Sequence, residues 1–135
     1  MRLLALQAIN ERMIGLKSRK DILDITDNAH CSESYHKFSP IPGFPVATDG
    51  VIALASAAGC FWLLDIVGSY QTNKKLDPEF QVWKLEVDCE NCNGVIRGYN
   101  DTDLIITQKI PWTDFPLDEV KLYLIDGIIL LPSEY

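Results

Sequence analysis

The stretch at residues 51–68 is apolar almost throughout, and it limits the possible folds more than any other part of the chain. Its 18 residues contain a single charge, Asp65. That length is the lower limit for a helix that crosses the hydrocarbon core of a membrane. It also suits a helix buried on more than one side in a small domain, which we favour because half-apolar strands elsewhere need a cover. Since Thr48 can cap such a helix, we expect a central buried helix at residues 49–71 and no membrane insertion.

After residue 78 the hydrophobic pattern changes to a period of two, which is typical of half-buried strands. The segments that show it are residues 80–87, 95–99, 104–110, 120–125 and 128–131. Between the last two, Asp126-Gly127 has the chemistry of a tight hairpin turn. We therefore predict an α+β fold, with a five-stranded antiparallel meander sheet at residues 80–131 that is covered on one face by two main helices.

The N-terminal part has a helical pattern followed by an irregular one. Apolar residues recur at three- and four-residue steps over residues 2–17, and Ser18 can start a second short helix, so N-terminal helices are expected at about residues 2–25. Residues 27–47 lose the pattern and contain three closely spaced prolines, so an irregular segment is expected there. With 135 residues and no linker-like tract, the chain is expected to form a single domain, 1–135.

The net charge of −7 is concentrated in the C-terminal half, where twelve acidic residues face four basic ones from residue 77 onward. Acidic surfaces repel phosphate backbones, so we expect no direct binding of nucleic acid and favour a protein partner with a basic surface. A charged surface that serves only solubility is the simpler alternative. The acidic candidates for contact with a partner lie on strands and turns: Glu86, Asp88, Glu90, Asp101 and Asp103.

Cys89 and Cys92 have the spacing of half a zinc site. The other two ligands would have to come from His30, Cys31 or His36, and a redox role would require a helix after the pair, where a strand is predicted. A polar hairpin loop is the remaining explanation, so we expect no metal and no cofactor. Because no secretory signal precedes the cysteines, reduced thiols and a cytoplasmic location are expected.

Residues 30–37 hold the only cluster of acid–base side chains, which includes Tyr35 and His36. Asp65 is a second candidate, because a carboxylate in an apolar helix is costly unless it has a partner or lies at an exposed position. It is either a perturbed acid or ligand anchor, or a structural carboxylate. Together with Asp49, these residues form the second set of candidate binding residues, and no catalytic residue is assigned.

Five short motifs resemble a bacterial family of unknown function that is also found in cyanobacteria. They are T-D-G-V at residues 48–51, A-G at 58–59, W-L-L-D at 62–65, S-x-Q at 69–71 and F-Q-V-W-K-L at 80–85. The resemblance covers about half of the chain and implies a soluble protein, often encoded with mobile elements. It implies no activity.

We therefore expect a small, acidic, non-enzymatic protein-binding or regulatory protein, such as an accessory or inhibitor encoded by a mobile element. One alternative is a small enzyme that uses the segment from His30 to Lys37 with Asp65. The other is a module stabilised by zinc at Cys89 and Cys92. The sequence does not indicate the oligomeric state.

Overall fold

The computed structural model describes residues 19–28 and 34–135. Its helices are α2 (Arg19–Asn28), α3 (Asp49–Ala58), α4 (Phe61–Ser69) and the short 3-10 turns η1 (Tyr70–Thr72) and η2 (Pro132–Glu134). Its strands are β1 (Tyr35–Lys37), β2 (Val46–Thr48), β3 (Gln81–Asp88), β4 (Asn93–Asn100), β5 (Asp103–Ile110), β6 (Glu119–Ile125) and β7 (Ile128–Leu130). The helix expected at residues 2–17 lies outside the described residues, as do His30 and Cys31.

The strands form one mixed sheet of seven, in the order β1-β2-β7-β6-β3-β4-β5. Strands β2 and β7 are parallel, and every other neighbouring pair is antiparallel. The prediction of a five-stranded antiparallel meander is therefore wrong, although all five predicted strands are present. It missed β1 and β2 because each has only three residues, too few for an alternating pattern, and both lie in the proline-containing segment 27–47.

The order also differs because β6 pairs with β3 and not with β5. The connection from β5 to β6 passes along one end of β4 and β3, where the Thr113 amide donates to the Cys92 carbonyl (2.8 Å) and the Val87 amide donates to the Asp118 carbonyl (2.8 Å). Phe115 and Leu117 in this connection are buried. Burial of these two side chains brings the chain to the free edge of β3. Strand β6 therefore pairs with β3 and does not pair with β5.

The single helix expected at residues 49–71 is wrong, because the segment forms two helices. Thr48 caps α3 by accepting a hydrogen bond from the Val51 amide (3.3 Å), and Gly59 ends it with a left-handed φ of 63°. A residue other than glycine adopts that conformation at a cost, so the break is specified locally. Within the part of the chain that the structure describes, no helix has the length and apolarity needed to cross a membrane.

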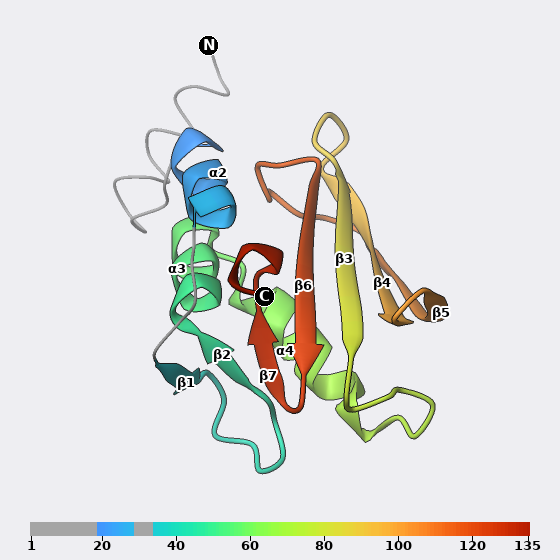
Figure 1. Ribbon diagram of the computed structural model, residues 1–135. Helices are drawn as coiled ribbons and strands as arrows, with labels where there is room; N and C mark the ends of the chain where they lie inside the picture. Colours follow the sequence, from blue (N-terminus) through green and yellow to red (C-terminus); the bar gives the residue numbers. More distant parts are fainter. Residues whose placement is uncertain (1–18, 29–33) are drawn as a thin grey trace.

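Helices α3 and α4 pack on one face of the sheet, and on the other face the described residues cover only the part beside η2 (Figure 1). Alternate residues of β3 and β6 point into the core, among them Leu85, Leu122 and Leu124, and they pack with Leu54, Leu63 and Leu64 of α3 and α4. The other set of alternate residues faces away from the helices. We call that side the open face.

A polar network in the core centres on Gln81. Its Oε1 accepts hydrogen bonds from Gln71 Nε2 (2.9 Å) and from the indole Nε1 of Trp83 (2.8 Å). Its Nε2 donates to Gln71 Oε1 (2.8 Å) and to the Asp77 carbonyl (3.0 Å). Gly98 on β4 makes room for the Trp83 ring, because a Cβ there would lie 2.8 Å from ring atoms. These contacts account for two of the motifs, S-x-Q and F-Q-V-W-K-L.

Candidate functional site

The strand registers align the side chains of the open face in transverse rows. One row is mainly apolar and runs across five strands through Leu130, Tyr123, Val82, Tyr99 and Leu104. The next row carries the cations Lys121, Lys84 and Arg97, and the row beyond it carries the carboxylates Glu119 and Glu86. The polarity of the open face therefore changes along the strand direction, from an apolar row to two charged rows.

The charges in the middle of the open face pair with one another. Arg97 binds Glu86 (2.5 Å), and Lys84 lies 3.8 Å from Glu86 and 3.5 Å from Glu119. Together with Lys121, this part of the surface holds three cations and two carboxylates. Glu86, one of the expected contact residues, is thus engaged within the sheet, and the middle of the open face has no excess of negative charge.

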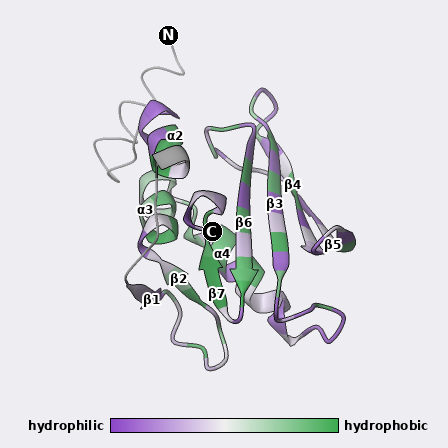
Figure 2. Cartoon of the chain, viewed as in Figure 1, coloured by the Kyte–Doolittle hydropathy of each residue, from purple (hydrophilic) through white to green (hydrophobic). Residues whose placement is uncertain are grey.

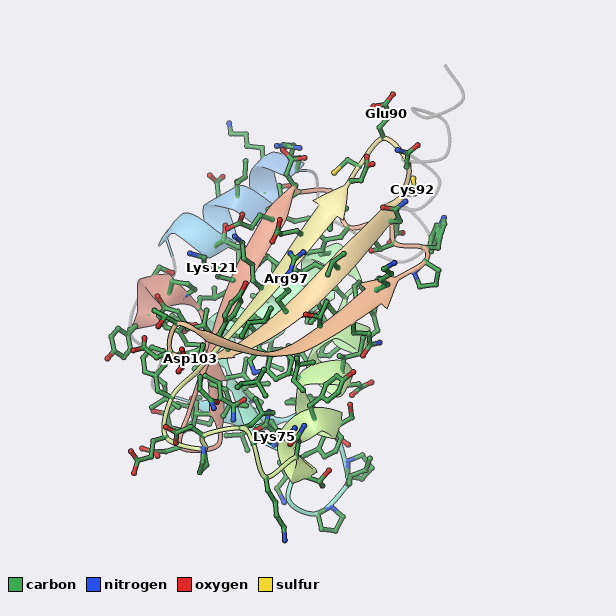
Figure 3. All side chains as sticks on the ribbon, turned by 90° about the vertical axis from the view of Figure 1, so that its right-hand side faces the viewer. Lys75, Glu90, Cys92, Arg97, Asp103 and Lys121 are labelled. Atoms are coloured by element: carbon green, nitrogen blue, oxygen red, sulfur yellow. The ribbon has the colours of Figure 1, made fainter. Side chains whose placement is uncertain are left out.

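The other four acidic candidates lie at opposite ends of the sheet. Asp88 and Glu90 are at the β3–β4 turn, whereas Asp101 and Asp103 are at the β4–β5 turn. Figure 3 shows Glu90 at one end of the sheet and Asp103 at the other, with Arg97 between them. The eight residues of β4 separate the two turns by about 23 Å at the usual rise of a strand. These carboxylates do not form one surface.

The Cys89–Cys92 segment is a closed polar turn. Asp88 Oδ1 accepts hydrogen bonds from the Glu90 and Asn91 amides (both 3.1 Å), and bonds from the Asn91 side chain and amide lower the Asp88 pKa. Partial burial, and then the hydrogen bond and charge of Asp118, raise the Cys89 pKa. No cluster of three metal-binding side chains occurs among residues 19–28 and 34–135.

A hollow on the open face lies where β1, β2, β7 and η2 meet. It has a volume of about 360 Å³ and is lined by eight residues from distant parts of the chain: Tyr35, Thr48, Ile125, Asp126, Ile128, Leu130, Glu134 and Tyr135. We call it the groove. Its floor is apolar because β7 is hydrophobic along its whole length (Figure 2). None of the eight lining residues carries a positive charge.

Glu134 forms a fixed polar wall of the groove. Its Oε1 accepts hydrogen bonds from the Thr48 hydroxyl (2.7 Å) and the Leu131 amide (2.9 Å), and the residue is 7 % exposed. Gly50 admits this carboxylate beside the start of α3, because a Cβ there would lie 2.8 Å from Glu134 Oε1. In the T-D-G-V motif, Thr48 thus caps α3, and Gly50 leaves the space that the Glu134 carboxylate occupies. Asp126, in contrast, is exposed at the β6–β7 turn.

Aromatic rings border the groove on both sides. Tyr135 meets Tyr123 and Phe80 edge to face, with centroid distances of 5.5 and 6.0 Å. Tyr35 lies on the other side, on β1, and is 57 % exposed. The groove therefore offers an apolar floor, aromatic sides and two carboxylates.

The structure separates the acid–base candidates. Tyr35 lines the groove, but His36 points to the opposite side of β1, because neighbouring side chains alternate along a strand, and it contacts Asp49 instead. Asp65 is exposed on α4, and no hydrogen bond or ion pair joins it to another described residue. Among the described candidates, the structure thus joins His36 with Asp49, whereas only Tyr35 lines the groove.

Sequence reasoning missed most of the groove. The sequence pattern around Asp126 indicates only a turn, and no motif marks the C-terminal residues Glu134 and Tyr135. The one available signal was the hydrophobic continuity of residues 128–131, which is unusual for a strand with an open face. No sequence pattern links Thr48 to Glu134, since 86 residues separate them.

Comparison with curated proteins gave no match, and comparison with solved structures gave none either. A model of a protein family matches residues 21–135, which include both the groove and the Gln81 network. The chain therefore belongs to a family of unknown function, DUF6876.

Proposed function

We propose that the protein is a non-enzymatic binding or regulatory protein that recognises a basic surface of another protein through the groove. The observation that carries the proposal is the described lining of the groove, in which an apolar floor lies beside Asp126 and Glu134 and none of the eight residues is cationic. Recognition sites in proteins commonly pair apolar surface with a few placed polar groups. The charges of this one complement a positive partner.

The overall charge supports a protein partner over a nucleic acid. The chain carries a net charge of −7, which repels phosphate backbones and attracts basic surfaces at a distance. A protein of this kind can cover a partner's phosphate-binding surface. We therefore propose an accessory or inhibitory role towards a basic protein, such as one encoded by the same mobile element.

The contact between His36 and Asp49 is the one observation that favours an enzyme. A carboxylate that orients a histidine is part of many nucleophilic sites, but such sites also need a nucleophile within reach of the histidine. In the described part of the chain, no hydroxyl or thiol is hydrogen-bonded to His36. Binding remains the function that we propose.

Affinity capture with matched variants tests the proposal. The bait is the full chain, compared with Asp126→Asn combined with Tyr35→Ala in the groove, and with Asp101→Asn combined with Asp103→Asn at the other turn. We expect basic proteins of the host to be retained at low salt by the wild type and the turn variant, and lost by the groove variant. Loss with the turn variant alone would instead locate recognition at the β4–β5 turn and contradict the proposal.

A further inference from the structure

The lining of the groove suits an extended side chain with a charged end. Its volume of about 360 Å³ is enough to admit such a group. Ile128 and Leu130, two residues apart on β7, give the floor an apolar length that suits an aliphatic stem. Asp126 and Glu134 supply the negative charge that a cationic end group would complement.

The two carboxylates of the groove differ in what they can still bind. Glu134 Oε1 already accepts hydrogen bonds from Thr48 and Leu131, so Glu134 contributes a fixed negative charge. Asp126 is exposed at the opposite end of β7, and no side-chain hydrogen bond or ion pair of its own is present among the described residues. Lys37, on the same side of β1 as Tyr35, is exposed and does not line the groove. Asp126 is therefore the carboxylate of the groove that we expect to pair with a cation.

From these observations we propose that the groove is a subsite for a single arginine side chain of a basic protein partner. The guanidinium pairs with Asp126 at one end of the groove, and the aliphatic stem lies on Ile128 and Leu130 towards the ring of Tyr35, which the strand register places at the Leu130 end. Arginine is preferred over lysine because its planar head can form two parallel hydrogen bonds with a carboxylate and is less strongly hydrated than an ammonium group. This inference rests on the proposed binding function and names the chemistry that the groove recognises.

A titration of the full chain followed through its amide NMR signals tests the inference. The probe is N-acetyl-arginine methylamide, and N-acetyl-citrulline methylamide is its neutral isostere. We expect saturable shifts at residues 125–130 with the arginine probe, a weaker response with the lysine analogue, and no saturable shift with citrulline. Equal responses to arginine and citrulline, or shifts centred on the Asp88–Glu90 turn, would overturn the inference.

Two variants locate the charge. Asp126→Asn should weaken binding of the arginine probe about fivefold, the scale of one exposed ion pair. Asp101→Asn is the matched control, because Asp101 has the same left-handed backbone (φ 56° against 50°) and lies outside the groove. It should leave the affinity unchanged. If Asp126→Asn disturbs the turn, Tyr35→Ala removes a wall of the groove without changing the charge, and it should weaken binding as well; unchanged affinity in that variant would count against the subsite.

The outcomes separate this inference from the proposed function. Capture that depends on the groove, without saturable binding of the arginine probe, would leave the binding function intact and refute the arginine subsite. Saturable and Asp126-dependent binding of the probe, without capture of any basic protein, would support the subsite and count against the proposed function.

Discussion

Replacing Gln81 by leucine should destabilise the protein by about 2–3 kcal/mol, although leucine is apolar and the site is fully buried. The cost arises from the partners that lose the amide. Trp83 is 1 % exposed, so its indole N–H would be left without an acceptor, at about 1–3 kcal/mol. Gln71 is only half-buried and Asp77 is exposed, so both can turn to water at lower cost. Most of the effect therefore belongs to one N–H group.

Urea unfolding followed by far-UV circular dichroism measures this effect in a double-mutant cycle. A Trp83→Phe variant has no indole N–H that could lose its acceptor. In that background, Gln81→Leu should lower the free energy of unfolding by about 1–2 kcal/mol less than it does in the wild type. Gln71→Leu is the control, because Gln81 keeps its bonds to Trp83 and Asp77 in that variant. Its cost should be about 1 kcal/mol. Additive costs of the Gln81 and Trp83 substitutions would refute the reasoning.

Three further outcomes are expected. Gly98→Ala should cost about 1–3 kcal/mol in the same assay, because the added Cβ would lie 2.8 Å from the rigid, buried Trp83 ring; an unchanged urea midpoint would contradict this. Asp65→Asn should change the free energy of unfolding by less than about 0.5 kcal/mol, because the side chain is exposed; a larger loss would show a partner that the described contacts lack. Burial, and then the charge of Asp114, raise the pKa of Cys60 to about 12 from the 9.0 of an ordinary thiol. Above pH 9 the unfolded state releases the thiol proton and the folded state keeps it, so the free energy of unfolding should fall by up to about 1.4 kcal/mol per pH unit. Urea unfolding at pH 8 and pH 10 measures this fall, and a Cys60→Ala variant should lack the part of it that the thiol causes.

The strands of the C-terminal half could be predicted because their side chains alternate between a buried and an open face. Their order in the sheet could not be predicted, because it depends on the tertiary contacts that bury Phe115 and Leu117. The division of residues 49–71 into two helices had a visible signal in Gly59. A glycine inside a helical pattern is often tolerated, however, so the signal alone did not decide the matter.

Less of the candidate site could be predicted. The sequence marks Tyr35 only through its neighbours His36 and Lys37. Tyr35 lines the groove because side chains alternate along β1, and the same alternation turns His36 to the other side. The sequence marks Asp65 because its helix is apolar, but one side of that helix is exposed. The groove itself joins segments around residues 35, 48 and 125–135, and only long-range pairing brings them together.

The parallel pairing of β2 with β7 has a consequence for synthesis on the ribosome. Strand β2 and the start of α3 emerge long before their partners, because the bond between Thr48 and Glu134 spans 86 residues. At the usual 5–20 residues per second, that interval is about 4–17 s. During this time β2 lacks its partner β7 along one edge. The space beside Gly50 likewise lacks the Glu134 carboxylate. We therefore expect a nascent chain of this length to be bound by chaperones that shield unpaired strands.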